Sequence, residues 1–142
     1  MEAIKWSEET LNNMLTEPSA ALVEDLKRLE GDIMVLGAGG KMGPDICVLA
    51  KKASVLGGSD RKIYAVSRFS DAAAAERLRS HGVTVIAADL MDANALQALP
   101  DCKNIIYMAG RKFGTNGTEY LTWGMNAWLP CMVVQRFRQS NI

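Results

Sequence analysis

Glycines cluster in one short segment of this chain, at Gly37, Gly39, Gly40 and Gly43. The apolar run at 33–36 precedes them and predicts a buried strand, and the apolar run at 46–53 follows them and predicts a helix. Glycines between a strand and a helix let backbone N–H groups come close to a phosphate, because no Cβ obstructs the approach. The start of the helix adds free N–H donors and a partial positive charge. The segment therefore predicts a turn that holds the pyrophosphate of NAD or NADP, with these contact residues: Gly37, Gly39, Gly40, Lys41, Met42 and Gly43.

The spacing of the glycines distinguishes two kinds of dinucleotide-binding turn. The plain G-x-G-x-x-G pattern starting at Gly37 would need a glycine at position 42, where the chain has Met42. The G-x-x-G-x-x-G pattern fits at Gly37, Gly40 and Gly43. Lys41, inside the turn, either adds positive charge near the phosphates or is a solvated surface lysine. The alternative to the whole site is a glycine-rich connection that holds no ligand.

Ser67 and Arg68 stand where a dinucleotide site contacts the adenosine ribose. An acidic residue usually binds the ribose 2′-hydroxyl there, but the end of the predicted strand 63–67 carries no carboxylate. The Ser67 hydroxyl can donate a hydrogen bond to a 2′-phosphate, and the Arg68 guanidinium can form charge-assisted bonds with it. NADP is therefore favoured over NAD. The alternatives are that Arg68 is a solvated charge or that it stacks on the adenine.

The G-x-x-G-x-x-G turn, followed by the sequence Val-Ser-Arg-Phe at 66–69, resembles the NAD-dependent epimerase/dehydratase-like family of the extended short-chain dehydrogenase/reductase superfamily. The resemblance runs from residue 31 to about residue 139 and implies roles for three further places. Asp89 and the backbone N–H of Leu90 would meet the adenine edge. Ala109 and Gly110 would lie against the ribose near the nicotinamide, and Asn126 would support the active-site backbone.

Each of these three places also has a purely structural interpretation. Asp89 could cap the helix that follows it, although Asp92 is better placed for that role. The Ala109–Gly110 segment could be a plain tight turn. Asn126 could be an exposed asparagine, although asparagine is unfavourable within a helix and its presence there suggests an assigned partner.

Catalytic residues are not identified in this chain. The resemblance implies a catalytic Tyr-x-x-x-Lys pair, but the position four residues after Tyr64, Tyr107 or Tyr120 is never a lysine. His81 precedes a glycine at a predicted helix end, where it is expected to meet the helix dipole rather than a substrate. We therefore expect the catalytic groups to lie beyond Ile142.

The chain is accordingly expected to be the cofactor-binding part of a longer NAD(P)-dependent oxidoreductase or sugar-nucleotide epimerase/dehydratase that acts on a small-molecule substrate. Alone, it would be inactive. One alternative is a stand-alone nicotinamide-nucleotide sensing or binding module without catalysis. Another is a structural domain whose glycine turn is empty.

Strands and helices alternate after the glycine turn. Strands are predicted at 33–36, 63–67, 83–87 and 104–108, and helices at 71–81, 92–99 and 119–139. This order predicts an α/β fold, a Rossmann-type doubly wound parallel sheet. Residues 140–142 predict the start of a fifth strand, so the sheet is expected to be incomplete at its C-terminal side.

The chain is expected to divide at residue 30. Residues 1–30 predict a helical extension in two pieces, with Ser7 capping the first and Pro18 in the first turn of the second. Residues 31–142 form the predicted NAD(P)-binding Rossmann domain. A surface loop is expected at 54–61, before the second strand.

Composition excludes several classes of partner. Sixteen basic residues balance sixteen acidic ones, so the chain lacks the basic footprint of a nucleic-acid binder. No apolar run approaches the roughly 20 residues that span a bilayer, and the N-terminus is too acidic and polar for a secretory signal.

The remaining expectations concern the three cysteines and the last helix. Cys47, Cys102 and Cys131 have no metal-binding or redox spacing. They are expected to be reduced structural thiols in apolar surroundings of a cytoplasmic protein. The apolar helix at 119–139 is a candidate for pairing with its copy in a homodimer, as in superfamily relatives.

Overall fold

The computed structural model describes residues 7–112 and 116–142, and it contains a parallel sheet of four strands in the order β3-β2-β1-β4. The strands are β1 (Ile33–Leu36), β2 (Ile63–Ser67), β3 (Thr84–Ala87) and β4 (Asn104–Tyr107). This is the strand order of a Rossmann-like doubly wound sheet, so the predicted fold class is confirmed. Asn141 forms an isolated parallel bridge with Asn104, which extends the sheet to a fifth position beside β4.

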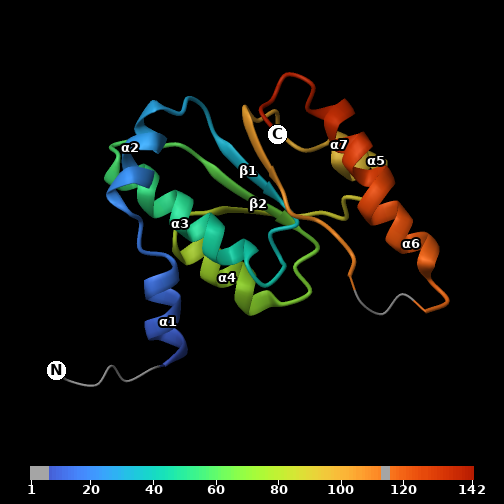
Figure 1. Cartoon of the computed structure of the whole chain (residues 1–142), viewed down its shortest axis with the longest axis horizontal. Coiled ribbons are helices and arrows are strands. Elements are labelled where there is room, and N and C mark those ends of the chain that lie inside the picture. The colour runs from blue at the N-terminus through green and yellow to red at the C-terminus, as the bar shows by residue number, and fades with distance from the viewer. Residues whose placement is uncertain (1–6, 113–115) are drawn as a thin grey trace.

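Helices cover both faces of the sheet (Figure 1). One face carries α2 (Ala20–Arg28), α3 (Gly43–Leu56) and α4 (Ala72–Ser80), and the other carries α5 (Ala93–Gln97) and α7 (Leu129–Arg136). The short helix α6 (Glu119–Trp123) lies on the same side as α5 and α7 (Figure 1). Successive side chains of β1 point to opposite faces, as they must in a strand. Ile33 and Val35 are buried against the first set of helices, and Met34 and Leu36 against the second. Burial on both faces explains why all four residues of β1 are apolar.

The predicted long helix at 119–139 consists of three continuous segments. A π-helical turn, η1 (Gly124–Trp128), lies between α6 and α7, and the backbone N–H of Leu129 donates to the carbonyl of Gly124, five residues earlier. Pro130 lies in the first turn of α7 and has no N–H to donate. The helix ends at Arg136, three residues earlier than expected, and the N–H of Phe137 makes the last bond to Val133.

Two local expectations were wrong, both for reasons of hydrogen bonding. The predicted surface loop at 54–61 begins inside α3, because the Ser54 hydroxyl donates to the carbonyl of Ala50 (2.8 Å) and is accommodated within the helix. At the other end of that segment, the Arg61 side chain is buried. In the extension, Ser19 caps α2 by accepting a bond from Leu22, so Pro18 lies before the helix rather than in its first turn.

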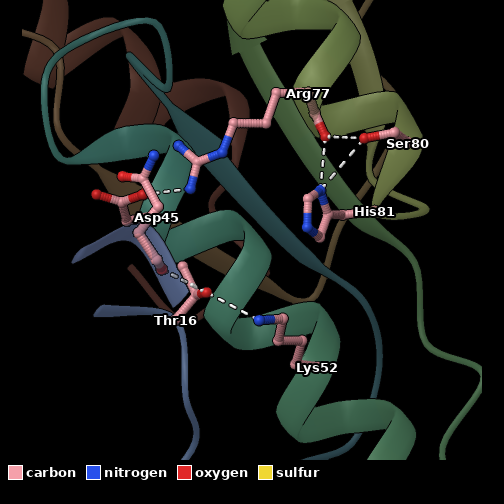
Figure 2. A network of polar contacts seen from close by, with 7 residues as sticks. Thr16, Asp45, Lys52, Arg77, Ser80 and His81 are labelled. Atoms are coloured by element: carbon pink, nitrogen blue, oxygen red, sulfur yellow. Dashed lines mark hydrogen bonds and ion pairs between the residues drawn. The ribbon is translucent and has the colours of Figure 1, made fainter. Parts of the chain in front are cut away.

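The helical extension is fastened to the rest of the fold by polar contacts. The first helix, α1 (Glu8–Leu15), is capped by Ser7 as predicted. Figure 2 shows how the residue after it, Thr16, accepts a hydrogen bond from Lys52 of α3 (2.9 Å). In the same network Arg77 of α4 pairs with Asp45 of α3 (2.8 Å).

Arg61 fastens the second helix of the extension. Its Nη2 donates to the carbonyls of Leu26 and Leu29, at the C-terminal end of α2. Those carbonyls would otherwise lack partners, because the last turn of a helix leaves its C=O groups free. A buried cation at this end is also favoured by the helix dipole. Leu26 itself is part of the core beneath α2.

Three further expectations concern isolated side chains. The Nδ1 atom of His81 lies 2.8 Å from the carbonyl of Arg77 in the last turn of α4, so the expected position at a helix end is confirmed. Cys47 and Cys102 are buried, and burial raises the pKa of Cys47 to about 12, which leaves the thiol unreactive. Cys131 is exposed, unlike the other two cysteines.

None of the helices in the described residues combines the length and the apolar character that crossing a bilayer requires.

Candidate functional site

The glycine turn joins β1 to α3 with very little space around its first glycine. Gly37 has a φ of +88°, and a Cβ at this position would lie 2.5 Å from the backbone N of Ala109. The N–H groups of Gly37 and Ala38 both donate to the carbonyl of Val66, at 2.9 and 3.0 Å. The chain therefore turns sharply between the ends of β2 and β4, and only glycine fits at position 37.

The remaining glycines of the turn differ in what they are needed for. A Cβ on Gly43 would lie 2.3 Å from the carbonyl oxygen of Ala38, so this glycine lets α3 pack on the turn. A Cβ on Gly39 would lie 2.5 Å from Oγ of Ser67. A Cβ on Gly40 would meet nothing closer than the Gly37 carbonyl, at 3.6 Å. Neither packing nor backbone conformation requires glycine at position 40, and its absent side chain leaves open space at the surface of the turn.

Several N–H groups of the turn are available for a ligand. The amides of Gly40 and Gly43 close two successive turns by donating to Gly37 and Gly40, both at 3.3 Å. The amides of Gly39, Lys41 and Met42 donate to no acceptor within 7–112 and 116–142. Free amides next to a helix start form an anion-binding surface.

A cleft of about 660 Å³ opens beside this turn. It lies at the carboxyl ends of all four strands, where ligands bind in open α/β sheets, and its size falls in the ~300–1,000 Å³ range of small-molecule sites. Most predicted site residues line it: Gly37, Gly39, Gly40, Ser67, Arg68, Asp89, Leu90, Ala109 and Gly110. The other predicted residues lie outside its lining: Lys41, Met42, Gly43 and Asn126.

The end of β2 carries more functional groups than the sequence indicated. Ser67 and Arg68 line the cleft as predicted, and the Ser67 hydroxyl has no hydrogen-bond partner in the part of the chain described. Phe69 follows with a φ of +47°, which is unusual for an aromatic residue and is typical of strained segments at binding sites. This turn brings Asp71 into the cleft lining as well, where its carboxylate accepts a bond from the N–H of Ala73 (2.9 Å) and caps α4.

The end of β3 settles the structural alternative for Asp89. Its carboxylate accepts a bond from the N–H of Met91 (3.0 Å), within its own turn. The cap of α5 is Asp92, which accepts bonds from Asn94 and Ala95. Asp89 therefore does not cap the helix, and its side chain lines the cleft.

Asn126 acts on the cleft through the backbone of Arg111. Its Oδ1 accepts a bond from the N–H of Arg111 (2.8 Å), and its Nδ2 donates to the carbonyl of the same residue (2.7 Å). The expected partner for this asparagine therefore exists, although the residue is exposed. On the other side of the π turn, the hydroxyl of Tyr107 donates to the carbonyl of Met125 (3.1 Å). π turns occur often at functional sites, and here two side chains hold one in place.

Sequence reasoning missed part of the cleft wall. The additional lining residues are Phe69, Ser70, Asp71, Ala74, Ala88, Met91, Met108, Arg111, Leu121 and Met125. The spacing of Leu121 and Met125, four residues apart on a helix, was a usable signal that they share a face. The position of Arg111 depends on a loop and had no such signal.

No hydrogen bond joins a tyrosine hydroxyl to a lysine among the residues that the structure describes. The Tyr107 hydroxyl is bonded to a carbonyl, and burial raises its pKa, so its deprotonated form is disfavoured. Tyr120 is exposed, and Tyr64 packs in the core. No cluster of metal-ligating side chains occurs among the described residues. The groups gathered at the cleft can bind and orient a ligand.

Comparison with protein-family models and with curated proteins gives no match to this chain.

Proposed function

We propose that the cleft binds NADP(H), and that residues 31–142 are the nucleotide-binding part of an NAD(P)-dependent oxidoreductase or sugar-nucleotide epimerase/dehydratase. The resemblance of the glycine turn to the epimerase/dehydratase-like family is one support of this proposal. The observation that carries it is Gly40, a glycine that the protein itself does not require, at the mouth of a cleft beside free amides. A phosphate cradle explains that glycine, because a Cβ would occupy the space of the ligand.

In this proposal each part of the cleft contacts one part of the cofactor. The free amide of Gly39, which lines the cleft, binds the pyrophosphate, with the free amides of Lys41 and Met42 next to it in the turn. The adenine lies near Asp89 and Leu90, and Ser67 and Arg68 contact the 2′-phosphate. Ala109 and Gly110 leave room for the ribose near the nicotinamide. The bound cofactor would supply a hydride acceptor or donor, and the residues of this chain would hold and orient it.

The direct experiment is a fluorescence titration of the purified chain with NADPH and with NADH. We expect saturable binding of both, with NADPH tighter. An absence of any response to either dinucleotide would contradict the proposal.

Replacing Arg68 with alanine should weaken NADPH binding more than NADH binding. A charge-assisted bond to the 2′-phosphate is worth about 1.5–3 kcal/mol, so we expect a loss of roughly tenfold or more for NADPH. NADH has no such phosphate and should bind almost as before. Equal losses for the two dinucleotides would mean that Arg68 does not contact the 2′-phosphate.

Replacing Asp71 is the counterpart of the Arg68 variant, because it removes a negative charge from the cleft instead of a positive one. Its carboxylate lines the same cleft as Arg68 and would repel a 2′-phosphate. Asparagine keeps the helix cap, because it is as good a capping residue as aspartate. The Asp71→Asn variant should therefore fold normally and bind NADPH more tightly than the wild type.

A second candidate function is a nucleotide-sensing or nucleotide-binding module without catalysis. The chain contains no Tyr-x-x-x-Lys sequence, which favours a nucleotide-binding role without catalysis for residues 1–142 by themselves. Both functions predict NADPH binding, and they differ in turnover. A full-length protein that binds NADPH but oxidises no hydroxyl compound would favour the sensing function.

We also propose that the protein forms a homodimer through α6, η1 and α7. Large apolar side chains are exposed along these helices at Tyr120, Trp123, Trp128 and Val134. Several large apolar side chains exposed along one helical segment favour an interface at that segment. Sedimentation velocity should show a dimer that the Trp123→Asp variant converts to a monomer. A wild-type chain that stays monomeric at high concentration would contradict the dimer.

A further inference from the structure

Arg111 lines the cleft just beyond β4, and Arg68 lines it beyond β2, on the other side of β1. The lining charges divide unevenly between these two sides. Arg68, Asp71 and Asp89 lie at the ends of β2 and β3, and both carboxylates accept bonds from nearby backbone N–H groups. At the β4 end, Arg111 is the one charged side chain among the described lining residues.

Two side-chain hydrogen bonds hold the backbone of Arg111 in place. The Asn126 side chain bonds both its N–H and its carbonyl, at 2.8 and 2.7 Å. These two bonds fix the direction in which the Arg111 side chain leaves the loop. The asparagine itself is held by the π turn, which Tyr107 stabilises from β4.

The guanidinium is also positioned from its far end. Its Nη2 donates to the Thr118 hydroxyl (2.9 Å), just before α6. The same cleft is also lined by the apolar side chains of Met108, Leu121 and Met125. A half-buried cation in such a cleft binds an anion more strongly than a solvated one, because the surroundings screen the charge less.

We propose that Arg111 is an oxyanion-binding residue of the cleft, which receives a phosphate or carboxylate at the end of β4. A planar guanidinium with several N–H donors suits such groups. This inference rests on the proposed dinucleotide site for one of its two sources, the nicotinamide-side phosphate of the cofactor. The other source is an acidic group on a second ligand, which would give the substrate a phosphate or carboxylate.

The test compares Arg111→Met with Lys112→Met. Both variants remove one positive charge, but Lys112 is exposed and does not line the cleft. The Arg111→Met change keeps the backbone groups that Asn126 binds, so the loop should stay in place, and circular dichroism and thermal unfolding check this. The probes are NADPH, 2′,5′-ADP, which lacks the nicotinamide-side phosphate, and inorganic phosphate added to the NADPH-saturated chain.

Two results would support the proposal and identify the source. If the anion belongs to the cofactor, Arg111→Met binds NADPH roughly tenfold more weakly and 2′,5′-ADP as before. If it belongs to a second ligand, both nucleotides bind normally, and the variant loses the shifts that phosphate causes in the amide NMR signals of Gly110 and Arg111.

The proposal is overturned if Arg111→Met matches Lys112→Met with all three probes. It is also overturned if the variant weakens NADPH and 2′,5′-ADP equally, since that would indicate a general disturbance of the cleft. Failure of the wild type to bind NADPH would contradict the proposed function instead. The phosphate titration on the chain without nucleotide would then still test Arg111.

Discussion

Replacing Gly40 with alanine is expected to weaken NADPH binding by roughly tenfold or more, a loss of at least about 1.4 kcal/mol, without lowering the stability of the fold. The new Cβ would meet no protein atom closer than 3.6 Å, and the backbone at this position is not left-handed. The unfolded chain loses some freedom when glycine becomes alanine, so stability should stay constant or rise by about 0.4–1 kcal/mol. Fluorescence titration and urea denaturation measure the two effects.

Gly43→Ala is the matched control, because the same change should have the opposite pattern. Its Cβ would lie 2.3 Å from the Ala38 carbonyl, so α3 or the turn must move. Overpacking of this kind costs about 1–3 kcal/mol. We expect a clear loss of stability for Gly43→Ala and a loss of binding alone for Gly40→Ala. Unchanged NADPH affinity in Gly40→Ala would remove the main support for a phosphate cradle.

Replacing Arg61 with methionine is expected to destabilise the fold by about 2–3 kcal/mol. Methionine fills much of the same space, but the carbonyls of Leu26 and Leu29 lose their charged donor. Burial of the cation has its own cost, since its Nε and Nη1 have no hydrogen-bond partner among the described residues. We expect the unpaired carbonyls to outweigh the relief of that cost, because removing one partner of a buried bond exposes the full desolvation penalty of the other.

The effect should concentrate in α2. Hydrogen exchange of its amides should accelerate more than exchange in β1, because α2 would separate from α3 before the sheet unfolds. Lys62→Met is the control, because Lys62 is an exposed neighbour of Arg61. Its backbone N–H donates to the Asp32 carboxylate (2.9 Å), and this bond is kept in the variant. Equal denaturation midpoints for Arg61→Met and Lys62→Met would show that Arg61 does not fasten the helix.

The central strand β1 was predictable because burial on both faces requires a continuous apolar run. Residues 33–36 illustrate this, since each of the four side chains enters one of the two cores. The cleft floor was predictable for a related reason: in a parallel sheet the residues that follow the strands meet at one edge. Asp89 and Ala109, whose roles the family resemblance implies, line the same cleft as Ser67 for this reason.

The rest of the site depends on geometry that no short pattern encodes. Asp71 reaches the cleft because Phe69 adopts a positive φ, which nothing in its residue type suggests. Arg111 is placed by two bonds from Asn126, fifteen residues later in the chain. The error at 54–61 has a simpler cause: a polar and glycine-rich composition indicates a surface loop, but Ser54 bonds within its own helix and the buried Arg61 bonds to the carbonyl of Leu26.

The π turn at 124–128 sets the rotational phase between α6 and α7. One residue corresponds to about 100° of rotation in an α-helix. If one residue were removed from this turn, α6 would rotate by about that angle relative to the buried face of α7. Leu121 would then leave the cleft wall, and the exposed Tyr120 and Trp123 would point in new directions. A single residue therefore determines both which side of α6 faces the ligand cleft and which side faces outward.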